Sequence, residues 1–108
     1  MVRYGLMIFV LFYVHFGFAQ GVYIQVQDSK ENVLSDVPVS IFTFLDSIMI
    51  KADYSNIEGK VVFSKLKPGK YLIKATFLGF EAFQKLIVVN QSDINLKIEM
   101  KESQSAIS

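Results

Sequence analysis

The residue types that most often carry out chemistry in proteins are scarce in this sequence of 108 residues. It contains no cysteine and one histidine, His15, which lies in an apolar N-terminal segment. Thiol nucleophiles, zinc sites built from Cys and His, and serine–histidine catalysis all need residues that the chain after this segment lacks. We therefore expect a protein that is not an enzyme and has no catalytic, cofactor-binding or metal-binding residues.

The ten acidic side chains are the remaining candidates for acid–base chemistry or calcium binding. Glycoside hydrolysis needs two carboxylates that converge on a cleft, whereas these acids are scattered over predicted turns and outward strand positions. The run Asp28-Ser29-Lys30-Glu31-Asn32 is the candidate for a calcium loop, and it has a lysine in its middle. A calcium loop needs clustered oxygen ligands, so this run predicts an Asx-type turn instead.

The first 19 residues have the pattern of a signal peptide. Arg3 is the only charge before Asp28, residues 6–18 are almost wholly apolar, and Gly17-Phe18-Ala19 resembles a signal-peptidase site. We expect residues 1–19 to form a signal helix that is cleaved before Gln20. The alternative is an uncleaved membrane anchor, which needs about 18 to 20 continuous apolar residues, more than this run provides.

Charge and cysteine content limit what the rest of the chain can bind and how it is stabilised. Removal of residues 1–19 leaves ten Lys and ten acidic residues, so the exported chain has no net charge. The two signs are interspersed and form no basic stripe, which disfavours nucleic-acid binding. Without cysteine the domain has no disulfides, and core packing alone must stabilise it.

Alternation of apolar and polar residues is the main structural signal after residue 20. A period of two predicts strands with one buried face, and no window shows a sustained helical period. Seven strands are expected, with inward or apolar sets at Val22/Ile24/Val26, Val37/Val39/Ile41, residues 48–54, Val61/Phe63, Tyr71/Ile73/Ala75/Phe77, residues 82–89 and Ile94/Leu96/Ile98/Met100. Residues 20–100 are thus predicted to form a seven-stranded antiparallel Greek-key β-sandwich, and residues 101–108 a flexible tail or the start of a linker.

Glycine and proline mark the predicted turns. Pro68 and Gly69 predict a type II turn that closes a hairpin between the fourth and fifth strands, with a positive φ at the glycine. Gly59, Gly69 and Gly79 are each expected to close a turn, so they do not form a phosphate-binding loop.

Several of these segments together resemble a known family. They are Val22-x-Ile24-x-Val26-x-Asp28, Val37-Pro38-Val39-Ser40-Ile41, Glu58-Gly59-Lys60-Val61-Val62-Phe63, Leu66-Lys67-Pro68-Gly69-Lys70-Tyr71 and Phe77-Leu78-Gly79-Phe80. In this order they resemble the carboxypeptidase regulatory-like domain, whose fold is a transthyretin-like (prealbumin-like) sandwich. Two positions depart from the family pattern: Asp36 replaces a common glycine, and Ile57 replaces a common Asp or Asn.

The resemblance implies a non-catalytic domain of the cell envelope. Such domains are found at the N-terminus of TonB-dependent outer-membrane receptors of Gram-negative bacteria, or beside secreted peptidases and glycan-active enzymes. We therefore expect an exported module in the periplasm, at the outer membrane or secreted, either as a stand-alone copy or as a piece of a longer chain. Its expected partner is another envelope protein or an appended β-barrel.

A group of apolar residues lies on the opposite phase from the predicted core. It comprises Phe42, Phe44, Leu72, Leu86 and Val88, and we add Phe80 as a candidate ligand contact. A contiguous exposed apolar group would mark a contact surface, whereas a β-bulge would return some of its members to the core.

A second hypothesis is a carbohydrate- or peptide-binding module that uses the aromatic rings of Tyr23, Tyr54 and Phe80. Tyr71 with Phe80 could form an aromatic shelf. Because Tyr71 shares the phase of Ile73, however, we expect it in the core with its hydroxyl at the rim.

Overall fold

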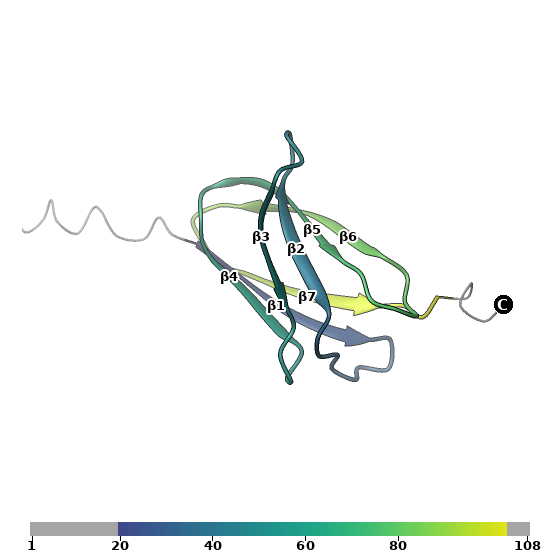
Figure 1. Cartoon of the computed structure of the whole chain (residues 1–108). Coiled ribbons are helices and arrows are strands. Elements are labelled where there is room, and N and C mark those ends of the chain that lie inside the picture. Colours follow the sequence, from purple (N-terminus) through teal and green to yellow (C-terminus); the bar gives the residue numbers. More distant parts are fainter. Residues whose placement is uncertain (1–19, 104–108) are drawn as a thin grey trace, which may run out of the picture.

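Seven β-strands make up the part of the chain that the computed structural model describes, residues 20–103 (Figure 1). They are β1 (Gln20–Asp28), β2 (Pro38–Thr43), β3 (Met49–Tyr54), β4 (Lys60–Leu66), β5 (Gly69–Ala75), β6 (Phe83–Val89) and β7 (Ile94–Met100). The predicted all-β class and strand number are confirmed. No helix occurs among these residues, and so none that could cross a membrane. The predicted signal peptide at 1–19 and residues 104–108 lie outside the described part.

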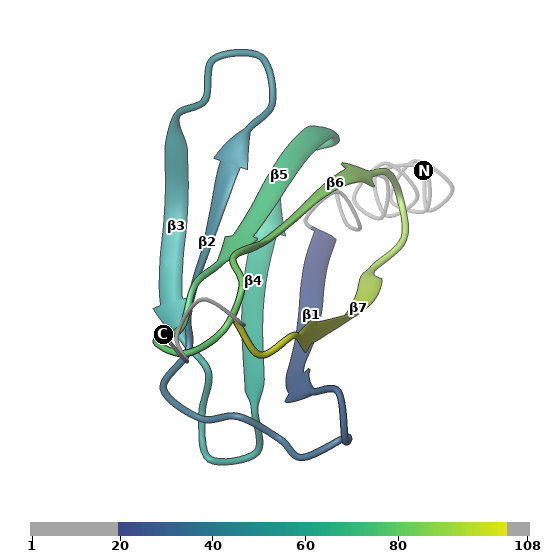
Figure 2. The same cartoon turned by 90° about the vertical axis from the view of Figure 1, so that its right-hand side faces the viewer.

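The strands form two stacked sheets (Figures 1 and 2). The three-stranded sheet has the order β4-β1-β7, and the four-stranded sheet has the order β3-β2-β5-β6. One pair differs from the predicted antiparallel arrangement, because β1 and β7 run parallel, from Val22↔Ile94 to Asp28↔Met100. Side chains alternate with a period of two in both kinds of pair, so the pattern in the sequence could not distinguish them.

The predicted hairpin between the fourth and fifth strands is wrong. β4 pairs with β1, whereas β5 pairs with β2 and β6. Residues 67–68 therefore carry the chain from one sheet to the other. The type II turn is also wrong, because Gly69 has a φ of 156° and is already the first residue of β5.

A β-bulge lies near the end of β4. Gln20 pairs with Leu66 and Val22 pairs with Phe63, so β4 contains one extra residue at this point, and Lys65 there has a φ of 60°. The extra residue changes the phase of the strand. As a result Leu66, which lies three positions after Phe63, is buried in the same interior.

The core lies between the sheets and, apart from Leu66, consists of residues at the inward positions of the alternation. Sixteen buried apolar residues form one cluster, which includes every inward residue expected for the first two strands. Phe77, Ile94 and Leu96 are half-buried and pack against this cluster. Tyr71 is buried as expected, and its hydroxyl donates a hydrogen bond of 2.6 Å to the carbonyl oxygen of Lys67.

A buried serine fixes the start of β2. The Ser55 hydroxyl donates to the carbonyl oxygen of Leu34 (2.7 Å) and accepts from the N–H of Val37 (2.9 Å). The backbone of Ser55 also bonds to Asp36 and Val37. These contacts hold Asp36 in a left-handed conformation, with a φ of 62°, directly before Val37, the buried residue that precedes β2.

Candidate interaction surfaces

The outer face of the four-stranded sheet carries a continuous apolar row. Phe42 pairs with Met49 on one side and with Leu72 on the other, and Leu72 pairs with Leu86. Directly paired residues project to the same face of a sheet, so this row crosses all four strands. The pairing of β2, β5 and β6 is continuous here, and a bulge does not return these side chains to the core.

A second row extends this apolar surface toward one end of the sandwich. The N–H of Phe44 donates to the carbonyl oxygen of Lys70 (3.2 Å), and Lys70 pairs with Val88. We call the combined surface the outer patch; its members are Phe42, Phe44, Met49, Leu72, Leu86 and Val88. Phe44, Met49, Leu86 and Val88 are each between 43 and 54 % exposed.

Lysines border the outer patch. Lys74 places its ammonium nitrogen 4.7 Å from the ring centroid of Phe42, a cation–π contact. Lys70 lies between Phe44 and Val88 in the second row. The outward positions of β2, β5 and β6 carry no acidic residue. The first row is therefore apolar throughout, and a lysine lies on each side of it, Lys74 on one side and Lys70 in the second row on the other.

The sixth residue predicted for the contact surface, Phe80, lies elsewhere. It belongs to the loop between β5 and β6, where its ring stacks on Phe77 with centroids 5.8 Å apart and packs against the core. Gly79, with a φ of 89°, turns the chain back over this end of the sandwich. Tyr71 lies at the other end of β5, so the suggested shelf of Tyr71 and Phe80 is not formed.

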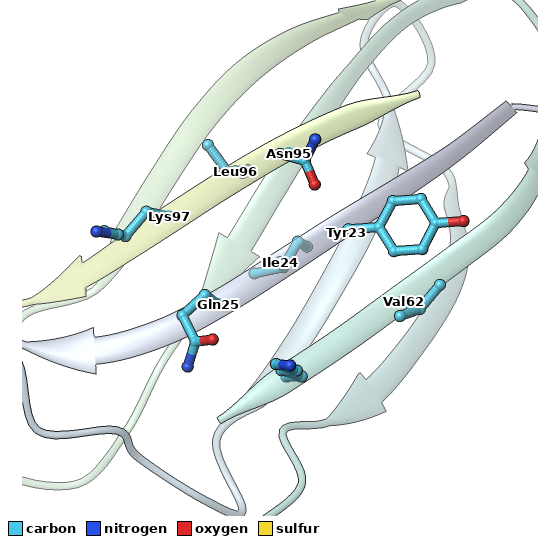
Figure 3. Close-up of a pocket in the computed structure, with 8 residues that line it drawn as sticks. Tyr23, Ile24, Gln25, Val62, Asn95, Leu96 and Lys97 are labelled. Atoms are coloured by element: carbon cyan, nitrogen blue, oxygen red, sulfur yellow. The ribbon is translucent and has the colours of Figure 1, made fainter. Parts of the chain in front are cut away.

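The outer face of the three-stranded sheet is more polar than the outer patch. Tyr23 pairs with Val62 on β4 and with Asn95 on β7, and the next outward row is Lys60, Gln25 and Lys97. Together they line a shallow depression of about 500 Å³ (Figure 3).

The tyrosine ring in this depression is held against its own strand. A Cβ at Gly21 would lie only 3.0 Å from the ring of Tyr23, so the glycine leaves the space that the ring occupies. Next to it, Gln25 donates from Nε2 to the carbonyl oxygen of Glu58 (2.7 Å), and Lys60 lies 3.8 Å from the Glu58 carboxylate. Tyr54 lies on the edge strand β3 and Phe80 in its loop, so the three aromatic residues of the second hypothesis do not share one surface.

The acidic run at residues 28–32 forms the predicted Asx turn. Asp28 Oδ1 accepts from the N–H groups of Lys30 (2.8 Å) and Asn32 (2.9 Å). These hydrogen bonds, first of all the one from Asn32, hold the pKa of the Asp28 carboxyl below its ordinary value. Within residues 20–103 no three His, Cys, Asp or Glu side chains are grouped closely enough to hold a metal ion.

Comparison with other proteins informs the fold. No protein-family profile matches this chain, and no curated protein matches it. Among solved structures, the 5-hydroxyisourate hydrolase of Klebsiella pneumoniae is similar, with 18 % identity, a TM-score of 0.66, and coverage of 78 % of this chain and 91 % of that one. The sandwich is transthyretin-like.

Domains of bacterial pilins share this fold. The pilus 2b backbone protein of group B streptococcus has 13 % identity and a TM-score of 0.65, with 82 % of this chain and 43 % of that chain covered. BcpA, the major pilin subunit of Bacillus cereus, has 14 % identity and a TM-score of 0.69, with 79 and 29 % covered. This chain thus spans less than half of either pilin. Because the same fold occurs in pilins and in a hydrolase, function has to be argued from the surfaces of this chain.

Proposed function

We propose that this chain is a non-catalytic, exported module of the cell envelope that binds another protein through its outer patch. The observation that supports this most is the apolar row across four paired strands, with lysines beside it and no acid at the outward positions of β2, β5 and β6. Isolated exposed apolar residues are ordinary, but a contiguous group of this kind is typical of an interaction site. The signal-like segment at 1–19 supports export, and the scarcity of reactive side chains supports a non-enzymatic role.

The partner that we propose is an outer-membrane β-barrel, such as a TonB-dependent receptor. This choice rests on the resemblance of residues 22–100 to the carboxypeptidase regulatory-like domain, which is an accessory domain of such receptors. The chain would then act as an accessory or interaction domain of the barrel, appended to it or bound to it.

The size of the patch indicates how strong this contact is. Full burial of one large apolar side chain contributes about 1.5–3 kcal/mol, so covering the exposed half of four of them contributes roughly 3–6 kcal/mol. Association itself costs about 4–15 kcal/mol in lost freedom of motion. The patch alone therefore supports a weak contact, which becomes effective with a partner that is tethered to the chain or confined to the same membrane.

Site-specific cross-linking in cells tests the proposal. A photo-reactive residue is placed at Val88 in the outer patch or at Val62 on the opposite sheet, two valines that are 50 and 48 % exposed. We expect Val88 to give a discrete adduct with an outer-membrane β-barrel and Val62 to give none. Equal adducts from both positions, or no barrel from either, would contradict the proposal.

A second candidate function is the binding of a carbohydrate or an extended peptide on the other sheet. It is favoured by the depression around Tyr23, where an exposed ring lies beside the side-chain amides of Gln25 and Asn95. A glycan array followed by titration tests it, with Tyr23→Ala as the variant and Tyr54→Ala, another exposed tyrosine, as the control. Loss of binding in the first variant alone supports the hypothesis, and no binding at about millimolar ligand, the weak limit of useful affinity, refutes it.

A further inference from the structure

We propose that one end of the sandwich docks on an anionic membrane surface by means of the β2–β3 hairpin and three neighbouring lysines. This goes beyond the proposed function, because it concerns a lipid partner at the end of the molecule, whereas the proposed function concerns a protein on the sheet face. Phe44 and Met49 of the outer patch also belong to this end, so the tests below use Leu45, Ile48 and the lysines.

The tip of the β2–β3 hairpin is the most apolar exposed segment among residues 20–103. Leu45 is 89 % exposed, Ile48 is 58 % exposed, and Phe44, Met49 and Ile50 are also exposed. Figure 2 shows this hairpin projecting beyond the other loops at the same end. A projecting group of apolar side chains can enter the boundary between lipid headgroups and acyl chains, which is how interfacial segments bind membranes.

Hydrogen bonds from Thr43 hold the tip in this conformation. The N–H of Thr43 donates to the carbonyl oxygen of Ile48 (2.9 Å), and the N–H of Ile48 donates to the Thr43 hydroxyl oxygen (3.1 Å). The N–H of Ser47 also donates to the Thr43 carbonyl oxygen (3.0 Å). The apolar side chains are therefore fixed outside the core before any partner is met, which lowers the entropic cost of binding.

The same end carries exposed lysines. Lys67 lies in the segment that links β4 to β5, Lys65 lies at the end of β4, and Lys70 lies at the start of β5. The N–H of Phe44 donates to the carbonyl oxygen of Lys70, which places Lys70 next to the hairpin. The one ion pair between side chains of residues 20–103 is that of Lys60 with Glu58, so these three ammonium groups are not neutralised by a carboxylate of the described chain. Anionic lipids would supply the missing negative charge.

Two acids lie at this end, and its net charge stays positive because the three lysines outnumber them. Asp93 accepts a hydrogen bond of 2.9 Å from the N–H of Gly21, and Asp46 lies at the apex of the hairpin. The loops at the opposite end carry four acids and one lysine, which are Glu31, Asp36, Glu58, Glu81 and Lys30. The charge of the molecule is thus distributed so that an anionic surface attracts the hairpin end and repels the other end.

The start of β1 also lies at this end. Gln20 pairs with Leu66, next to the linking segment, and residues 1–19 join the sandwich at Gln20. If this segment is retained as an anchor, the alternative left open by the sequence, the membrane lies at the hairpin end. The lysines favour a lipid bilayer over a second copy of the chain, and in a chain that retains residues 1–19 the connectivity does so as well.

Vesicle binding of the processed chain, residues 20–108, tests the proposal. All sixteen core residues lie between positions 22 and 100, so the sandwich is complete without residues 1–19. The chain has no cysteine, which allows an environment-sensitive dye to be attached to Leu45→Cys. The control is Leu78→Cys, because Leu78 is 97 % exposed and lies at the opposite end.

We expect the dye at position 45 to shift to shorter wavelength on vesicles of phosphatidylglycerol and phosphatidylcholine, while the dye at position 78 does not respond. Replacement of all three lysines by Gln should weaken partitioning roughly a hundredfold, since each lysine near an anionic surface contributes about 1 kcal/mol. The control variant, Lys30→Gln with Lys101→Gln, removes two lysines at the opposite end and should leave partitioning unchanged. Asp46→Asn should strengthen it about fivefold by the same measure.

Three results would overturn the proposal. They are absence of binding to anionic vesicles, an equal response of both dyes, and a dimer in solution that Ile48→Ser abolishes while vesicles have no effect. None of them bears on the cross-linking of Val88, so failure here can be distinguished from failure of the proposed function.

Discussion

Two neighbouring residues of β5 provide a sharp test of the two faces of the four-stranded sheet. Ile73 is fully buried between the sheets, whereas Leu72 is half-buried on the outer face. Ile73→Ala removes three carbon atoms, worth roughly 2.4 kcal/mol of transfer free energy at about 0.8 kcal/mol each. The cavity left behind raises the total loss of unfolding free energy to about 2–5 kcal/mol.

This loss is large for a domain of this size. At about 0.05–0.15 kcal/mol per residue, the described sandwich has a free energy of unfolding of roughly 4–13 kcal/mol. Each kcal/mol corresponds to about 4–8 °C in Tm for a domain of this length, so Ile73→Ala should lower Tm by at least about 8 °C. Leu72→Ala should cost about 1 kcal/mol or less, because the native side chain is still partly in water.

Thermal unfolding followed by circular dichroism, together with urea titration, measures both variants against the native chain. The expected order is a strong effect at Ile73 and a weak effect at Leu72. Equal losses would refute the assignment of the apolar row to an outer, non-core surface. A reversed order would refute the inward phase of the whole sheet.

Three further predictions concern the loops. Ser55→Ala leaves the buried N–H of Val37 without its side-chain acceptor, and should cost about 1–3 kcal/mol in urea unfolding; an unchanged midpoint would contradict the role given to this hydroxyl. Asp36→Gly should raise the free energy of unfolding by up to about 1 kcal/mol, since glycine adopts a φ of 62° with less strain than aspartate does; a loss of stability would show that the Asp36 side chain contributes more than the strain costs. Because the pKa of Asp28 is lowered in the folded state, its stabilisation is present above the unfolded pKa of about 3.9 and is lost as pH falls through the folded value. Asp28→Asn should therefore be less stable than the native chain at neutral pH, with the difference shrinking below about pH 4; a difference that stays constant with pH would contradict this reading.

The inward faces of the strands could be predicted from the sequence because burial of one face imposes a period of two. Val39 and Ile98, for example, lie where the alternation places them, fully or almost fully buried. Strand pairing could not be predicted in the same way, because that period is identical whether consecutive strands pair with each other or belong to different sheets. The segment around Pro68 illustrates this, since it has the composition of a hairpin turn but connects two layers.

Local features that depend on tertiary contacts were also missed. At the bulge, Lys65 has a left-handed backbone conformation. Glycine is common at such a position and would have indicated a bulge in the sequence, whereas lysine does not. Ser55 stands in a polar loop sequence like many exposed serines, and only the fold reveals that its hydroxyl is buried between two backbone groups. The position of Asp36, by contrast, did carry a signal, because glycine is usual there in the family that the chain resembles.

The candidate surface could be predicted in part. The outward phase of Phe42, Leu72 and Leu86 follows from the sequence, but their alignment in one row depends on the strand order. Met49 was not predicted to belong to the surface, because the sequence does not define which residues of β3 point outward. Phe80 lies away from this face because the chain turns at Gly79. The alternation of residues in the sequence did not define the direction of that turn.

The central claim is that another protein covers the outer patch in the cell envelope, and thiol accessibility tests it most directly. Single cysteines replace Val88 and, as control, Val62, and both are labelled with a membrane-permeant thiol reagent in intact cells and in the purified chain. The account predicts that position 88 reacts freely in the purified chain and is protected in cells, while position 62 reacts in both. Equal and rapid labelling of both positions in cells would mean that the outer patch faces water in its native setting, and would contradict the claim.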